Sequence, residues 1–221
     1  MSKKEMNQMH QFNMAAMAAS AKVASRAVAQ LTTLEKNALL NAIADAIEIN
    51  SDQIISENNK DIKAGKEKGL ASAMLDRLVL NEQGIKDISS AIREIVALTD
   101  PVGDISNLSL RPNGMQVGKM RIPLGVIAMI YEARPNVTAE AAALCIKSGN
   151  AVILRGGSEA IHSNLAIANC LHTVLTEYGV DKNIVSVIPD TSRSVIEELL
   201  KQNEPIDLVI PRGGEGLIRY V

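Results

Sequence analysis

The sequence predicts an α/β protein with a doubly wound parallel sheet, preceded by helices and carrying a protruding β-hairpin. Two observations lead to this fold class. After Pro123, short apolar runs alternate with helical segments, and strands joined by crossover helices form parallel sheets. The first of these runs, residues 125–130, is apolar throughout, as expected of a strand buried on both faces. We expect an N-terminal helical part at 1–104, the hairpin at 105–122 and the α/β region at 123–221.

The first expected helix covers residues 3–30, which are rich in Ala and Met and contain neither Gly nor Pro. Small side chains recur in this segment at helical spacing, which predicts a face for close packing. The residues of this predicted face are Met6, Met9, Asn13, Ala16, Met17, Ser20, Val23, Ala27 and Leu31.

Three further helices are expected before the hairpin. One begins at Thr32 or Thr33, because a capping residue there is followed by Glu35 or Lys36. Its expected apolar face consists of Leu39, Leu40, Ile43, Ile47, Ile54 and Ile55. The other two helices are expected at residues 59–68, ended by Gly69, and at residues 82–98.

The hairpin is predicted from two short alternating runs, residues 106–111 and 115–121, joined by Pro112, Asn113 and Gly114. Asn-Gly between two such runs is a strong hairpin signal, because both turn positions then take positive φ. No helix of its own accompanies the hairpin. We therefore expect it to project and to pair with another surface.

The α/β region contains two glycine turns that follow expected strands, at residues 155–158 and 211–214. Ligands of open α/β sheets bind at the carboxyl ends of the strands, where backbone N–H groups can point at phosphate oxygens. A nucleotide site is therefore expected, although the sequence has no G-x-G-x-x-G loop. The remaining elements are expected as strands at 151–154, 184–188 and 206–210, and as helices at 137–147, 158–178 and 192–201.

The composition narrows the functional classes. Only 2% of the 221 residues are aromatic, and the net charge is -2 without a long basic block, so nucleic-acid binding is not expected. No apolar run has membrane-spanning length, and the two cysteines, Cys145 and Cys170, lack C-x-x-C spacing. A reducing, cytoplasmic location is expected. The three His residues have no metal-ligand spacing, and we expect no metal site.

Several longer strings are distinctive enough to compare with known families. The main one is Tyr131-Glu-Ala-Arg-Pro-Asn-Val-Thr138, preceded by Pro123-Leu-Gly-Val-Ile127. The others are Asn150-Ala-Val-Ile-Leu-Arg-Gly-Gly157, Ile210-Pro-Arg-Gly-Gly214, Ala73-Met-Leu-Asp-Arg-Leu78 and Asp100-Pro-Val-Gly103. Together they resemble the gamma-glutamyl phosphate reductase family of the aldehyde dehydrogenase superfamily, and they occur in that family's order along essentially the whole chain.

The resemblance implies an aldehyde dehydrogenase-like cofactor-binding domain and a reaction in proline biosynthesis. In that reaction NADPH reduces gamma-glutamyl phosphate, through a thioester on a cysteine, to glutamate 5-semialdehyde with release of phosphate. A homo-oligomer and a functional link to glutamate 5-kinase are also implied. The family's nucleophilic cysteine lies in a second domain beyond residue 221, and neither Cys145 nor Cys170 matches its motif. We therefore expect a truncated chain that is inactive alone.

Asn136 is the candidate catalytic residue, because it matches the superfamily Asn whose amide helps to hold the oxyanion. The alternative role for Asn136 is a helix N-cap. Arg134 is a candidate for binding the charged end of the substrate, and the alternative is an ion pair with Glu132 or Glu140.

Arg155, Gly156, Gly157 and Ser158 match the superfamily turn that contacts the adenosine side of the cofactor. Arg155 beside the Ser158 hydroxyl tolerates a 2′-phosphate, which favours NADPH over NADH. Gly213 and Gly214 match the turn under the pyrophosphate. Plain glycine turns remain an alternative. For the whole protein, the alternatives are a nucleotide-binding module without catalysis, a scaffold, and a general aldehyde dehydrogenase.

Overall fold

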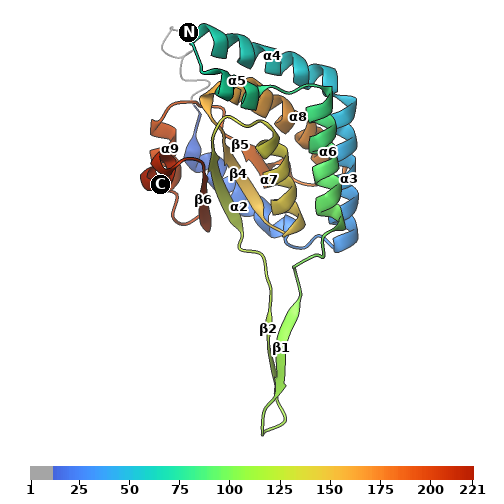
Figure 1. The fold of residues 1–221 in the computed structure, drawn as a ribbon. Coiled ribbons are helices and arrows are strands. Elements are labelled where there is room, and N and C mark those ends of the chain that lie inside the picture. Colours follow the sequence, from blue (N-terminus) through green and yellow to red (C-terminus); the bar gives the residue numbers. More distant parts are fainter. Residues whose placement is uncertain (1–11) are drawn as a thin grey trace, which may run out of the picture.

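The computed structural model describes residues 12–221, and the predicted packing positions Met6 and Met9 lie outside this range. Helices form the first half of the described chain (Figure 1). They are α2 (Met14–Val28), α3 (Thr33–Ile49), α4 (Ser51–Glu67), α5 (Ser72–Leu78) and α6 (Glu82–Ala97). Two strands follow, β1 (Ile105–Leu110) and β2 (Gln116–Met120).

The second half of the chain confirms the doubly wound parallel sheet. Its four strands lie in the order β5-β4-β3-β6, and every neighbouring pair is parallel. The chain thus moves outward from β3 to β5 and then returns to the other side of β3, which makes a topological switch point between β3 and β6. The strands are β3 (Val126–Tyr131), β4 (Ala151–Arg155), β5 (Val185–Val187) and β6 (Leu208–Arg212).

Helices cover both faces of this sheet. On one face α2 packs on β3, β4 and β5 and also contacts α9. On the other face lie α7 and α8, and α3 and α6 form a further layer over them (Figure 1). The elements of this half are the helices α7 (Asn136–Lys147), α8 (Ile161–Glu177), α9 (Ser194–Leu200) and α10 (Glu215–Tyr220), with short 3-10 turns at Ser158–Ala160 and Lys182–Ile184.

The packed face predicted for the first helix is mostly wrong, although Met17 and Leu31 are partly buried against the core. Asn13, Ala16, Val23 and Ala27 are exposed, and the buried face of α2 consists of Met14, Ala18, Ala21, Ala24, Ser25 and Val28. In an Ala-rich segment several stripes of small residues look alike. The stripe that is buried is the one that packs on the sheet strands β3, β4 and β5.

The second helix begins as predicted but ends earlier. Thr32 caps α3, with its hydroxyl accepting from the Glu35 N–H and the Glu35 carboxylate accepting from the Thr32 N–H. The expected apolar face continued to Ile54 and Ile55, whereas the helix stops at Asn50 and α4 starts directly after it. The short helix α5 was not predicted.

The hairpin forms where predicted, but its turn differs. Only Gly114, with φ of 85°, has positive φ in the turn, so the expectation for Asn113 is wrong. The Arg111 N–H donates to the Met115 carbonyl at 2.8 Å, which closes a three-residue loop. The Asn113 side-chain oxygen instead accepts from the Met115 N–H at 3.1 Å.

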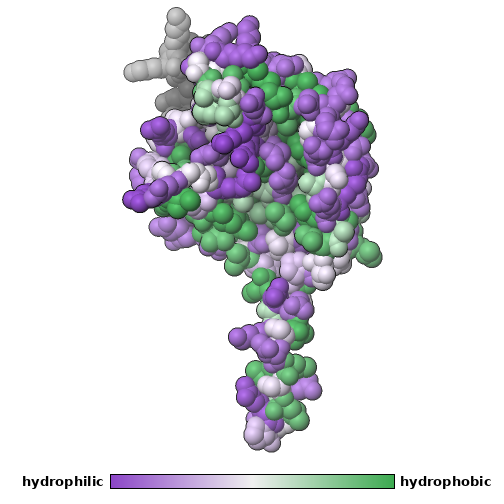
Figure 2. All heavy atoms as spheres, viewed as in Figure 1, coloured by the Kyte–Doolittle hydropathy of each residue, from purple (hydrophilic) through white to green (hydrophobic). Residues whose placement is uncertain are grey.

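The hairpin projects from the body of the molecule, as predicted (Figure 1). Every residue of β1 and β2 is exposed, and apolar and polar side chains alternate along the stalk (Figure 2). Within β1 a register shift between Ser106 and Ser109 marks a β-bulge, where Asn107 has φ of 55°. The exposed apolar side chains here include Ile105, Leu108, Leu110, Met115 and Met120.

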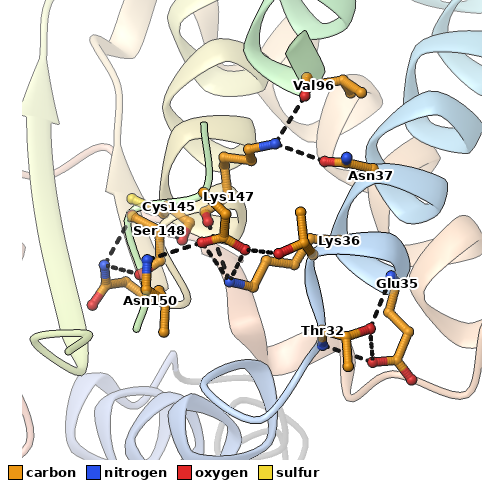
Figure 3. Close-up of polar contacts among 12 residues, drawn as sticks. Thr32, Glu35, Lys36, Asn37, Val96, Cys145, Lys147, Ser148 and Asn150 are labelled. Carbon is orange, nitrogen blue, oxygen red and sulfur yellow. Dashed lines mark hydrogen bonds and ion pairs between the residues drawn. The ribbon is translucent and has the colours of Figure 1, made fainter. Parts of the chain in front are cut away.

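A buried polar network holds the root of the hairpin to the helices. The ammonium group of Lys36 donates to both carboxylate oxygens of Asp100, at 3.1 and 2.9 Å, and these side chains are 1% and 9% exposed. Lys147, at the end of α7, donates to Asn37 and to the Val96 carbonyl (Figure 3). In residues 12–221 no helix has the length and apolar character needed to cross a membrane.

Candidate functional site

The loops at the carboxyl ends of the strands enclose three neighbouring cavities. The first, of about 430 Å³, lies at the ends of β3 and β4 and is bordered by α5. The second, of about 420 Å³, lies between the loops after β4 and β5 and helix α10. These two cavities share Arg155, Gly157, Glu159 and Leu217. The third, of about 260 Å³, occupies the switch point and is lined by Glu132, Arg134, Arg212 and Gly213.

Arg155, the last residue of β4, is 9% exposed and holds two loops together. Its guanidinium donates to the carbonyls of Gly156 at 2.9 Å, Thr191 at 3.0 Å and Ser192 at 3.4 Å. Its buried Nε–H has no partner within the described part of the chain. Burial lowers the pKa of Arg155, and the nearby carboxylates of Glu159 and Asp190 oppose this shift. The group stays protonated at neutral pH, so the site carries a buried cation.

The two glycines after Arg155 are required by close packing. A Cβ on Gly156 would collide with the Asn164 amide and lie 3.1 Å from the Tyr131 ring. A Cβ on Gly157 would lie 2.9 Å from the backbone nitrogen of Ala133, in the loop after β3. The glycines therefore bring the loops after β3 and β4 together, which leaves backbone groups next to the cavities.

A buried chain of hydrogen bonds supports this turn from below. The Tyr131 and Thr138 hydroxyls lie 2.7 Å apart, and Thr138 donates to the Asn164 side-chain oxygen at 2.8 Å. Burial raises the pKa of Tyr131 to about 12. The phenol therefore stays neutral at physiological pH and acts as a fixed support.

At the switch point a carboxylate bridges the two diverging strands. The Glu132 side chain, which follows β3, accepts from the Gly214 N–H, which follows β6, at 2.8 Å. A Cβ on Gly213 would lie 2.8 Å from the same carboxylate oxygen. Arg134 and Arg212 line the same cavity as Glu132 and Gly213. One backbone donor of this turn, the Gly214 N–H, thus already binds an anionic oxygen.

Asn136 is the first residue of α7 and is half-buried. Its side-chain amide donates to the Glu140 carboxylate at 2.9 Å, and it does not cap the helix. The N-cap alternative for Asn136 is therefore wrong. The ion-pair alternative for Arg134 is also absent from residues 12–221, where Arg134 has no carboxylate partner.

Arginines outnumber carboxylates in all three cavities, although the net charge of the chain is -2. The first cavity has three arginines against two glutamates, and the second and third each have two against one. A cationic crevice at the carboxyl ends of the strands suits a ligand with several negative charges. Across the described residues, no group of three or more His, Cys, Asp and Glu side chains could hold a metal ion.

Both cysteines are buried on helices, as predicted from the apolar segments around them. Burial raises the pKa of the Cys145 thiol to about 12 and also raises that of Cys170. Because the thiolate is the nucleophile, these thiols are unreactive at neutral pH. Neither cysteine lines one of the three cavities.

The structure brings most of the predicted site residues to this edge. Arg155 and Gly157 line the first two cavities, and Ser158 lines the second. Arg134 lines the first and third, and Gly213 lines the third. Asn136, Gly156 and Gly214 line none of the three cavities.

Sequence reasoning missed three arginines at this edge: Arg77, Arg193 and Arg212. Arg193 and Arg212 could have been found, because they lie at or beyond the carboxyl ends of predicted strands. Arg77 lies on the helix α5, which no pattern had indicated.

The family model for the aldehyde dehydrogenase family matches residues 3–221. The chain belongs to the aldehyde dehydrogenase family. Among solved structures, the gamma-glutamyl phosphate reductase of Thermotoga maritima superposes on 95% of this chain and 50% of its own length, with a TM-score of 0.92 and 36% identity. A probable aldehyde dehydrogenase of Listeria monocytogenes, 16% identical with a TM-score of 0.71, shares the fold.

The curated relatives in the aldehyde dehydrogenase family are closer in sequence. A gamma-glutamyl phosphate reductase of Colwellia psychrerythraea is 80% identical over 213 residues, which are 96% of this chain and 51% of the relative. That of Geobacter metallireducens is 58% identical over 205 residues, which are 93% of this chain and 49% of the relative. The chain thus spans about half the length of the curated relatives it matches.

Proposed function

We propose that this chain is the cofactor-binding half of an NADPH-dependent gamma-glutamyl phosphate reductase of proline biosynthesis. The reaction reduces gamma-glutamyl phosphate to glutamate 5-semialdehyde and releases phosphate. The observation that carries the proposal is the 80% identity to the Colwellia relative across 96% of the chain. The cationic crevice at the carboxyl ends of the strands supports it, because the cofactor is an anion that binds at such an edge.

The residues present fit a dinucleotide phosphate. Arg155 offers a buried Nε–H without a partner among the described residues, and Gly157 lines both the first and the second cavity. We assign Arg155, Gly156, Gly157 and Ser158 to the adenosine side and Gly213 with Gly214 to the pyrophosphate. When bound there, NADPH would supply the hydride for reduction of the thioester. The chain's own task is to bind and orient the cofactor and to hold the charge that develops on the substrate.

Two residues of this chain face the substrate in the proposal. Asn136 keeps one amide N–H on Glu140, and its second N–H stabilises the oxyanion of the tetrahedral intermediate. Arg134, free of carboxylate partners among the described residues, binds the carboxylate or phosphate of gamma-glutamyl phosphate. The nucleophilic cysteine comes from the second half of the protein.

We also propose that the whole protein is a cytoplasmic homo-oligomer and acts after a glutamate 5-kinase. The exposed hairpin supports association, because its apolar side chains have no cover within the described residues. The kinase link follows from the chemistry of the substrate. Gamma-glutamyl phosphate is an acyl phosphate, and it is formed when the gamma-carboxylate of glutamate is phosphorylated.

The proposal can be tested with a fusion of this chain to the second half of the Colwellia relative, called the joined protein below. The joined protein should reduce NADP⁺ with glutamate 5-semialdehyde and phosphate, the reverse reaction, whereas the 221-residue chain alone should bind NADPH without turnover. As controls, Cys145→Ser and Cys170→Ser should leave the joined protein active. A folded joined protein that binds NADPH but shows no turnover would refute the proposal, as would turnover by the chain alone.

A further inference from the structure

The guanidinium of Arg155 is already engaged by the protein itself. It donates to three backbone carbonyls, two of which belong to Thr191 and Ser192 in the loop after β5. A phosphate is best bound by two parallel N–H groups of one guanidinium. Most of the N–H donors of Arg155 are therefore used to hold the backbone, mainly that of the loop after β5, and are not available to a phosphate.

That loop carries a second arginine, Arg193, which lines the second cavity together with Ser158 and Thr191. Within residues 12–221 the Arg193 side chain makes no ion pair and no hydrogen bond, and the residue is exposed. It is close enough to Arg155 for its charge to help lower the Arg155 pKa. The Arg193 guanidinium, which has no partner among the described residues, thus lies near the Arg155 guanidinium, which is bound to backbone carbonyls.

The surroundings of Arg193 favour an anion. The carboxylate of Asp190, three residues earlier, accepts from the Ser192 N–H at 2.7 Å and so closes the turn of its own loop. Only one glutamate, Glu159, lines the second cavity, against the two arginines. The hydroxyl-bearing residues Ser158 and Thr191 line the same cavity and add neutral donors that tolerate a phosphate.

We propose that Arg193 is the specificity-determining residue that binds the 2′-phosphate of the cofactor, and that Arg155 is a positioning residue that holds the Arg193 loop. This inference rests on the proposed function. It assigns to Arg193 the role that the sequence pattern had suggested for Arg155. The ligand recognised in the second cavity is then a 2′-phosphorylated adenosine.

The experiment compares two ligands that differ only in this phosphate, 2′,5′-ADP and 5′-AMP, by calorimetry at one ionic strength. The chain should bind 2′,5′-ADP at least about tenfold more tightly. Arg193→Gln should remove most of this ratio and leave 5′-AMP binding unchanged, and Arg193→Lys should keep part of it. Arg77→Gln, the matched control, removes an arginine that lines only the first cavity and should preserve the ratio.

The positioning role of Arg155 has its own readout. Arg155→Gln should lower the affinity ratio of the two ligands, a quantity that a general loss of stability would not change. In the double variant with Arg193→Gln, the ratio should fall no further than with Arg193→Gln alone, because both changes act through one contact. A further fall would show that Arg155 reads the phosphate itself.

Two outcomes separate the inference from the proposed function. If Arg193→Gln retains the wild-type ratio, the inference is wrong although the cofactor site stands. If the wild-type chain binds neither ligand nor NADPH, the proposed cofactor site fails and the inference fails with it.

Discussion

At the scale of single residues, substitutions of Asn136 test whether this residue is catalytic or only structural. We expect Asn136→Ala to lower kcat about a hundredfold in the joined protein, because an oxyanion donor is lost, with little change in NADPH affinity. Asn136→Asp should be at least as damaging, because its carboxylate would face that of Glu140, now 2.9 Å from the amide. Steady-state kinetics and NADPH titration measure both effects. Full activity of Asn136→Asp would contradict the oxyanion role.

A second residue-scale prediction concerns the buried pair at the hairpin root. Asp100→Asn leaves the Lys36 ammonium buried without a counter-charge, so we expect a loss of about 3 kcal/mol in the free energy of unfolding at neutral pH. Urea denaturation measures this loss. As the control, Glu57→Gln removes a more exposed pair with Lys60 and should cost less than about 1 kcal/mol.

The Lys36–Asp100 pair also predicts how the free energy of unfolding changes with pH. Burial alone would raise the pKa of Asp100, but hydrogen bonds from Lys36, the Val102 N–H and Thr33 outweigh it and lower the pKa. A lowered carboxyl pKa stabilises the fold above the unfolded value of about 3.9 and ceases to do so as pH falls through the folded value. The difference between wild type and Asp100→Asn should therefore shrink below about pH 4. A difference that is constant from neutral to strongly acid pH would contradict the charge argument.

At the scale of elements, the turn between β6 and α10, to which we assign the cofactor pyrophosphate, holds the Glu132 carboxylate through the Gly214 N–H. Removing this negative charge should help an incoming diphosphate. We expect Glu132→Gln to raise NADPH affinity about fivefold, since a nearby like charge in a partly solvated site costs about 1 kcal/mol. Calorimetry with NADPH measures this. Glu215→Gln, which removes an exposed charge already paired with Arg219, serves as the control and should have little effect.

If Glu132→Gln instead weakens NADPH binding, the carboxylate helps to build the site and does not compete with the phosphate.

The hairpin is the second element with a testable role. Its exposed apolar side chains and two free edges predict that it mediates association of copies. Replacing residues 105–120 by a short Gly-Ser linker in the joined protein should lower the mass measured by light scattering to that of a monomer. The Gly114→Ala variant, which strains the turn but keeps both strands, should associate more weakly than wild type. An unchanged mass after the replacement would exclude the hairpin from the interface.

Elements with local signals could be predicted, and elements decided by distant packing could not. Thr32 with Glu35, and Gly114 in the hairpin turn, act through hydrogen bonds and backbone angles within a few residues. The buried face of α2 depends on which stripe meets the sheet. The break at Asn50 depends on how α3 and α4 pack on α8, which lies over a hundred residues away.

At the scale of the whole molecule, the candidate site residues that could be placed from the sequence are those that come directly after a predicted strand. Arg155, Gly157 and Gly213 lie in turns after predicted strands, and the parallel sheet brings such turns to one edge. The roles within the site could not be predicted. The sequence places Arg155 and Arg193 thirty-eight positions apart. Only the folded loops show that the Arg155 guanidinium binds the carbonyls of Thr191 and Ser192, the two residues just before Arg193.

The bulge in β1 bears on the symmetry of any assembly. A ribbon that adds copies at both free edges forms a heterologous contact that does not close and grows into a fibre. The irregular register around Asn107 makes the outer edge of β1 a poor template, which leaves the regular edge of β2 for pairing. When two copies join through β2 alone, the same edge meets itself about a two-fold axis, and growth stops at two. In the proposed association through the hairpin, one extra residue in one strand thus favours a closed, isologous dimer over an open polymer.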